Sequence, residues 1–126
     1  MVVKYSIMQQ GTPALYAALC EISENGLRLL RLMGQTAYVI VPQQIDGYEV
    51  KSIGKYCFAA KRDCNNRTLD SEWEQLEHMA LTDGMHELSG DYIENVVLPD
   101  SVNVLESYAF YNCRKLNYLE FGSSLN

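Results

Sequence analysis

The side chains best suited to chemistry lie in one acidic segment, residues 59–92, which holds eight acidic and three basic residues and both histidines of the chain. Glu74 and His78 are four residues apart, so on a helix they would share one face. With His86 or Glu87 they could ligate a metal ion, because zinc sites use such nitrogen and oxygen donors. A small metal-dependent enzyme is therefore one interpretation of this segment.

A thiol offers a second kind of chemistry in the same segment. Cys64 could act as a nucleophile if His78 or His86 served as its general base. We favour a simpler interpretation of both patterns, a solvated acidic helix face and an unrelated loop thiol. The reason is that the sequence has no HExxH motif, nucleophile elbow or phosphate loop. The prediction is therefore a non-catalytic protein without a metal or cofactor.

Aromatic side chains are the other candidates for a functional site, and their chemistry would be binding. Tyrosine and tryptophan are enriched where proteins contact other proteins. Tyr118 lies next to the strand residue Leu119, so its ring should point away from the core. For Trp73 we favour burial, because it lies on the apolar side of a predicted helix. For the tyrosines the alternative is that they are ordinary, scattered surface residues. The candidates are Trp73, Tyr108, Tyr111 and Tyr118.

Composition limits the kind of protein that can position these residues. A chain of 126 residues with 48% apolar residues suits a single globular domain. Its formal net charge of −6 argues against a nucleic-acid partner, which would require clustered Lys and Arg. The N-terminal region has neither a basic start nor an uninterrupted apolar run, so no signal peptide or membrane span is predicted. Four cysteines without CxxC spacing indicate reduced thiols.

An internal repeat predicts the architecture. Its period is 23 residues (116 − 93), because the apolar residues of one copy recur with the same spacing in the next. These residues are Ile93, Val96 and Leu98 in one copy and Leu116, Leu119 and Phe121 in the other. An imperfect earlier copy starts at Val39, and a period of 23 is typical of leucine-rich repeats. Each copy should form a short strand, followed by a turn or short helix that closes one coil.

The same residues resemble the BspA-type leucine-rich repeats of bacterial surface proteins. The stretch "IENVVLPDSVNVLESYAFYNCRKLNYLEF" shows the phrases "LP-x-SV", "AF" and "C-x-x-L", and "VIVPQQIDGYEVKSIGKYCF" resembles an early coil of such arrays. "CEISENGLRLLRLMGQTAYVIVP" resembles the hairpin that precedes that coil. The resemblance implies a binding scaffold for protein or glycan partners, in some members an adhesin, and a secreted or cell-surface location.

The predicted fold is an α/β leucine-rich-repeat solenoid, rich in β-structure, with short parallel strands. The chain is interpreted as a single domain, 1–126, whose insertion contains an amphipathic helix with a capping box at Ser71 and Glu74 and a stop at Gly84. Within it, 1–36 is an N-terminal segment and hairpin cap, 37–58 the first coil, 59–92 the helical acidic insertion and 93–126 the second coil and the start of a third. The hairpin should turn at Glu24-Asn25-Gly26, because Asn-Gly favours tight turns.

The C-terminal end of the repeats predicts self-association. The last copy stops before any equivalents of Leu105, Phe110 and Cys113. An unpaired strand edge beside an open core invites pairing with another chain. We therefore expect either that the array continues or that two copies form a homodimer around Leu119, Phe121 and Leu125.

Overall fold

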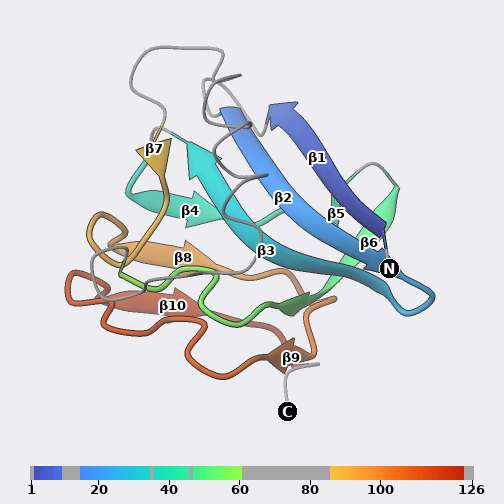
Figure 1. Cartoon of the computed structure of the whole chain (residues 1–126). Coiled ribbons are helices and arrows are strands. Elements are labelled where there is room, and N and C mark those ends of the chain that lie inside the picture. The colour runs from blue at the N-terminus through green and yellow to red at the C-terminus, as the bar shows by residue number, and fades with distance from the viewer. Residues whose placement is uncertain (1, 10–14, 35, 46, 61–85, 124–126) are drawn as a thin grey trace.

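The structure is a computed structural model that describes residues 2–9, 15–34, 36–45, 47–60 and 86–123 (Figure 1). In these ranges the chain forms strands and turns. The strands are β1 (Val2–Gln9), β2 (Leu15–Ser23), β3 (Gly26–Gly34), β4 (Tyr38–Ile40), β5 (Gln44–Ile45), β6 (Tyr48–Ile53), β7 (His86–Glu87), β8 (Asn95–Val97), β9 (Val104–Leu105) and β10 (Tyr118–Glu120).

Strands β1, β2 and β3 form an antiparallel meander, in which a tight turn joins β2 to β3. The turn ends at Gly26, whose φ of 122° is a conformation that glycine adopts without steric cost. A Cβ added at Gly26 would lie 2.6 Å from Cγ of Lys51 on β6, so the neighbouring strand also requires glycine there. The turn predicted at Glu24-Asn25-Gly26 is confirmed.

The meander continues into strands that come much later in the chain. Strand β6 pairs with β3 in parallel, and β9 pairs with β6 in parallel. Ile53 of β6 lies opposite Leu105 of β9, and the repeat spacing makes these two positions equivalent. The short strand β5 pairs antiparallel with β6, and the short strand β7 pairs antiparallel with β3. Together these strands form a seven-stranded sheet.

A second, smaller sheet contains β4, β8 and β10, all parallel, with β8 in the middle. Figure 1 shows these three strands stacked one below another. Val39, Val96 and Leu119 lie side by side in register, as the matching apolar spacing within the three copies predicts. This confirms that the repeats place equivalent strand residues on neighbouring strands.

The hydrophobic core is shared by the two sheets. Alternate residues of β3, including Leu27 and Leu29, are buried on the inner face of the large sheet. Val39 and Val96 are buried on the inner face of the small sheet. Phe58, fully buried, belongs to the same core cluster and follows β6. Full burial of each such side chain stabilises the fold by about 1.5–3 kcal/mol.

The prediction of an α/β solenoid is wrong. The described residues contain no helix, and the apolar segments that follow the small-sheet strands form β6 and β9 and extend a curled sheet. The turns after them cannot be helical, because Tyr56 and Tyr108 have φ of 62° and 61°, outside the right-handed helical region. The N-terminal hairpin, β2 and β3, belongs to the larger sheet, in which β3 pairs with β6.

The helix predicted between Ser71 and Gly84 lies outside the described residues. The flanking parts of the predicted helical insertion, 59–60 and 86–92, are turns and the short strand β7. Within the described ranges, no helix is long and apolar enough to span a membrane.

Candidate binding surfaces

The outward side of the small sheet carries an exposed row of large side chains. We call it the outer sheet face, and it consists of Tyr38, Ile40, Asn95, Val97, Tyr118 and Glu120. Tyr38 is 61% exposed, Ile40 49% and Tyr118 48%. Because successive strand residues point to opposite sides, the packing of Val39, Val96 and Leu119 against the core directs these neighbours outward. The outward orientation predicted for Tyr118 is confirmed.

Hydrogen bonds hold the two tyrosines of the outer sheet face at its opposite edges. The hydroxyl of Tyr118 donates to a carboxylate oxygen of Glu120 at 2.7 Å. This hydrogen bond, with the nearby negative charge, raises the pKa of the Tyr118 phenol above its ordinary value. At the other edge, the backbone N–H of Tyr38 donates to Oγ1 of Thr36 at 2.9 Å.

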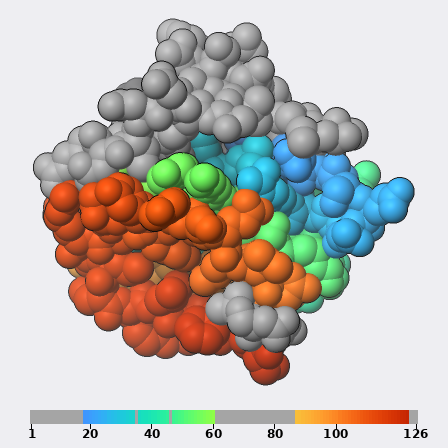
Figure 2. Space-filling view, turned by 60° about the horizontal axis from the view of Figure 1, so that its bottom comes forward, coloured from blue at the N-terminus to red at the C-terminus, as the bar shows by residue number. Residues whose placement is uncertain are grey.

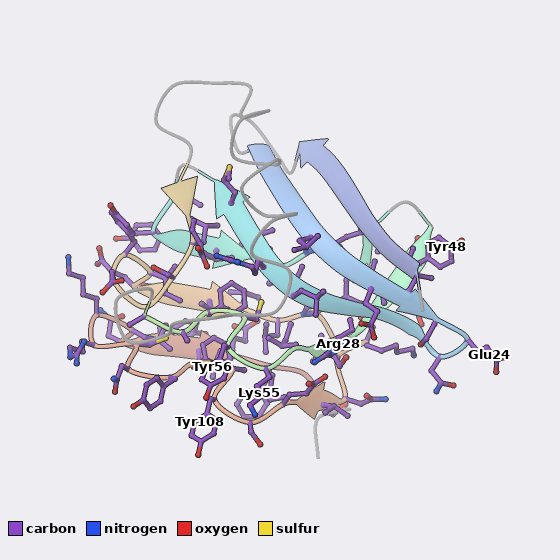
Figure 3. All side chains as sticks on the ribbon, viewed as in Figure 1. Glu24, Arg28, Tyr48, Lys55, Tyr56 and Tyr108 are labelled. Carbon is purple, nitrogen blue, oxygen red and sulfur yellow. The ribbon has the colours of Figure 1, made fainter. Side chains whose placement is uncertain are left out.

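Lys55, Tyr56 and Tyr108 gather at the turns that follow β6 and β9 (Figure 3). The rings of Tyr56 and Tyr108 are stacked, with centroids 5.4 Å apart and planes 8° apart. Tyr111 packs edge-on against both rings. Nζ of Lys55 lies 5.5 Å from the Tyr56 centroid and 5.9 Å from that of Tyr108, within cation–π range. The structure thus brings together two predicted candidates, Tyr108 and Tyr111, and places Tyr118 elsewhere.

The stacked tyrosines occupy equivalent positions of two repeat copies. Phe58 and Phe110, two residues further along each copy, stack in the same way with centroids 5.2 Å apart. Backbone hydrogen bonds tie the two turns together, and Figure 2 shows the segments around 54–60 and 102–113 side by side. The positive φ of Tyr56 and Tyr108 costs on the order of 1 kcal/mol each, a strain that the ring stacking offsets.

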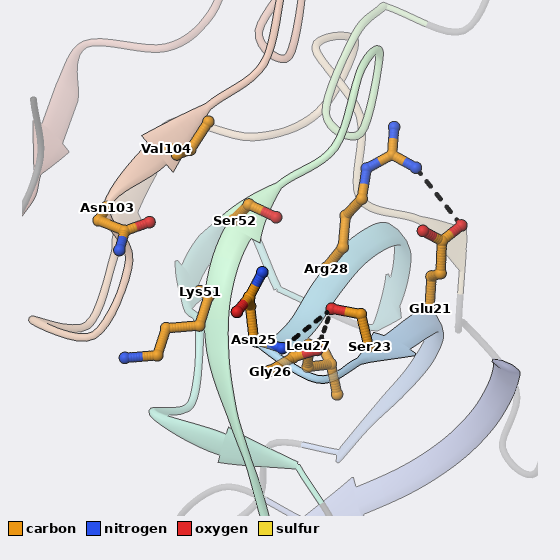
Figure 4. Close-up of a pocket in the computed structure, with 10 residues that line it drawn as sticks. All are labelled: Glu21, Ser23, Asn25, Gly26, Leu27, Arg28, Lys51, Ser52, Asn103 and Val104. Carbon is orange, nitrogen blue, oxygen red and sulfur yellow. Dashed lines mark hydrogen bonds and ion pairs between the residues drawn. The ribbon is translucent and has the colours of Figure 1, made fainter. Parts of the chain in front are cut away.

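A polar cleft of about 510 Å³ opens between the β2–β3 turn and strands β6 and β9 (Figure 4). Hydroxyl and amide side chains line much of it, including those of Ser52 and Asn103. The charged side chains Arg28 and Lys51 in the cleft form ion pairs within the protein. Arg28 forms a bidentate ion pair with Glu106 at 2.5 and 2.6 Å, and Lys51 pairs with Glu49 at 3.0 Å.

These ion pairs shift the pKa values of their members. The hydrogen bonds that Arg28 donates to the Glu106 carboxylate raise the pKa of Arg28, so the guanidinium stays charged. The hydrogen bond from Lys51 lowers the pKa of the Glu49 carboxyl. The cleft therefore presents neutral hydrogen-bonding groups beside charges that already have partners.

Most residues of the predicted metal and thiol sites lie outside the described ranges, namely Cys64, Glu74 and His78. The candidate binding residue Trp73 also lies outside them. His86 is on β7, next to Glu87. Glu87 is buried and forms an ion pair with Arg31 of β3 at 2.9 Å, so its charge is used inside the fold. The described part of the chain contains no group of three or more His, Cys, Asp or Glu residues placed to hold a metal ion.

Among the described residues, Cys20, Cys57 and Cys113 are cysteines that are not joined in a disulfide. Cys57 is fully buried one residue before Phe58, as expected of a small core residue. Cys113 is partly buried, and its thiol donates to the carbonyl oxygen of Phe58 at 3.2 Å. These thiols therefore contribute to packing in the core.

Sequence reasoning missed the part of the outer sheet face that belongs to β4. Tyr38 lies opposite Asn95, and Asn95 lies opposite Tyr118, so Tyr38 occupies the repeat position of Tyr118. The spacing within each copy could have found it, because Tyr38 precedes Val39 as Tyr118 precedes Leu119, but the earlier copy is imperfect at Thr36.

Comparison with known proteins identifies the repeat. Residues 84–126 match the family described as the BspA type Leucine rich repeat region (6 copies). Neither a curated protein nor a solved structure matches the chain. The matched residues include β8, β9 and β10 and the turn that carries Tyr108 and Tyr111. Residues 84–126 therefore belong to the BspA-type leucine-rich repeats.

Proposed function

We propose that this chain is a non-catalytic interaction module that binds a protein partner through the outer sheet face. The observation that carries the proposal is the exposure of Tyr38, Ile40 and Tyr118 on one side of a parallel sheet. Large aromatic and aliphatic side chains of this kind become the energetic centre of an interface when a partner covers them. Membership of residues 84–126 in a repeat family supports a binding role.

The outer sheet face has the chemical pattern of an interface. Tyrosine offers a large rigid surface together with a hydroxyl, so it contacts both apolar and polar groups of a partner. Glu120 adds a negative charge at one edge, next to Tyr118. A partner with apolar side chains and a basic rim would complement these groups.

The test compares three immobilised proteins in capture from an extract of extracellular-matrix proteins. They are the wild type, the double variant Tyr38→Ser/Tyr118→Ser, and the control Tyr48→Ser. Tyr48 is also exposed, at 43%, but lies on β6 far from the outer sheet face (Figure 3). A partner retained by the wild type and the control but lost with the double variant supports the proposal.

The captured partner is then titrated in purified form by calorimetry. Loss of both exposed tyrosines should weaken binding at least tenfold, about 1.4 kcal/mol. A partner that binds the double variant as tightly as the wild type contradicts the proposed site. A substrate turned over by the wild-type chain would contradict the non-catalytic role.

A glycan is the second candidate partner, and the polar cleft favours it. Its hydroxyl and amide groups can hydrogen-bond a neutral polyhydroxylated ligand, and the neighbouring charges are already paired. Chitotriose, cellotriose and maltotriose are suitable probes in NMR titrations. Shifts at Ser52 and Asn103 that disappear in Asn103→Ala would support this candidate, and unchanged spectra with all three sugars would exclude these probes as ligands.

A further inference from the structure

The turn between β2 and β3 exposes an asparagine, Asn25, directly before Gly26. The amide side chain of Asn25 lines the polar cleft, and in the view of Figure 4 it lies between the side chains of Lys51 and Arg28. The outer sheet face does not include this amide. Its chemistry is therefore separate from the protein partner proposed for that face.

The glycine that follows Asn25 makes the amide reactive. The backbone nitrogen of the next residue can attack the side-chain carbonyl carbon of an asparagine, and glycine, which has no Cβ, leaves that nitrogen sterically open. In this reaction the Gly26 nitrogen bonds to Cγ of Asn25 and the bond from Cγ to the side-chain nitrogen breaks. That nitrogen leaves as ammonia with the proton of the Gly26 amide. Water then opens the cyclic imide at either carbonyl and gives aspartate or isoaspartate.

The structure of the turn leaves the reacting atoms accessible. The Ser23 hydroxyl accepts a hydrogen bond from the backbone N–H of Asn25 at 3.3 Å and donates one to the carbonyl oxygen of Gly26 at 3.4 Å. Neither hydrogen bond involves the Gly26 nitrogen or Cγ of Asn25. Gly26 begins β3 and pairs with Ser23 at the end of the ladder. Because the ends of a ladder open at little cost in free energy, the Gly26 nitrogen can react without unfolding of the core.

We propose that Asn25 is a site of spontaneous deamidation, which converts a neutral amide of the polar cleft into a carboxylate. The new negative charge would compete with Glu49 for the ammonium group of Lys51, which Glu49 now contacts at 3.0 Å. The modification consumes only water and needs no partner. It is therefore independent of what the outer sheet face binds.

The isoaspartate product would also disturb the backbone of the turn. Isoaspartate carries the main chain through the side-chain carbonyl and so lengthens it by an extra carbon atom. Gly26 has little room to move towards β6, because an added Cβ would lie 2.6 Å from Cγ of Lys51 and 3.0 Å from the carbonyl oxygen of Glu49. The longer turn should therefore fit less well against β6 and lower the stability of the fold.

The experiment incubates the folded protein in neutral and in mildly alkaline buffer and locates deamidation by mass spectrometry of its peptides. Asn25 should convert, and faster at the higher pH, because the attacking nitrogen must lose its proton. Asn103 is the matched control within the same chain, since it is exposed in the same cleft but precedes the β-branched Val104. Asn103 should stay intact over the same period. Asn25→Gln should abolish the reaction, because the longer glutamine side chain cyclises far more slowly.

A second measurement separates the added charge from the longer backbone. The isoaspartate form is purified by anion exchange and identified by labelling with an isoaspartyl methyltransferase. It should unfold at a lower temperature than Asn25→Asp, which adds the charge but keeps the backbone length. If Asn25 stays intact in the folded protein, even though it converts in urea, the proposal is overturned, as it is by equal conversion of Asn103. An isoaspartate form as stable as Asn25→Asp overturns the predicted disturbance of the turn.

Discussion

Individual aromatic residues show how the repeats use equivalent positions differently. Phe58 and Phe110 stack on each other, but only Phe58 is fully buried. Phe58→Ala should therefore lower the free energy of unfolding by about 3–5 kcal/mol, because it leaves a cavity in the core. Phe110→Ala should cost less, about 1–2 kcal/mol, since its site is already partly open. Urea denaturation of both variants measures the difference, and equal losses would contradict the burial pattern.

The hydrogen bond between Tyr118 and Glu120 predicts an alkaline titration. The raised pKa of Tyr118 means that the fold favours the protonated phenol. Its contribution to stability is present below the ordinary tyrosine pKa and is lost as pH rises through the raised value. Ultraviolet absorbance of the wild type, with the Tyr118→Phe curve subtracted, isolates this titration. Glu120→Gln should move it to lower pH, and an unchanged midpoint would show that the carboxylate is not the cause.

At the scale of elements, a buried ion pair joins two strands whose paired residues are 56 positions apart in the sequence. Arg31 of β3 and Glu87 of β7 are both about 5% exposed or less, and their charged groups meet at 2.9 Å. Glu87→Gln should destabilise the protein by about 3 kcal/mol, because it removes the countercharge of a buried guanidinium. Glu49→Gln is the matched control, as Glu49 pairs with Lys51 at the surface. Urea midpoints that fall equally in both variants would contradict the distinction.

The elements also show what the sequence could and could not predict. The register of β4, β8 and β10 was predictable because the same apolar spacing occurs in each of the three copies. The β2–β3 turn was predictable because Asn25-Gly26 favours it. The sequence did not predict that β6 and β9 are strands, because apolar runs this short do not distinguish a strand from a helical turn. Pairing of β3 with β6 depends on tertiary contacts that no local pattern encodes.

The candidate surfaces were predictable only in part for the same reason. Tyr118 was placed correctly because strand alternation fixes the side of its neighbour Leu119. The sequence did not predict that Lys55, Tyr56 and Tyr108 lie together. Tyr56 and Tyr108 adopt positive φ in their turns, and a tyrosine in the sequence does not indicate that conformation.

For the whole molecule, the shared core makes the N-terminal strands indispensable. Strands β2 and β3 supply buried residues, among them Cys20, Leu27, Leu29 and Leu32, that pack with those of the small sheet. Deletion of residues 1–36 should therefore leave a chain that does not fold. The expected observations are narrow amide dispersion in NMR spectra and no cooperative thermal transition. A truncated chain with dispersed peaks and a sharp transition would show that the repeats fold without the hairpin.

The pairing of β4 with β8 has a consequence for the order in which a newly made chain acquires its structure. A ribosome releases β1, β2 and β3 first, and these strands can pair with one another as soon as they emerge. Val39 of β4 must wait until Val96 has been synthesised, because β4 pairs with β8 alone among the described strands. Closing so long a loop is slow and costs chain entropy. The small sheet is thus completed after the meander, and until then the nascent chain exposes the apolar residues of β4.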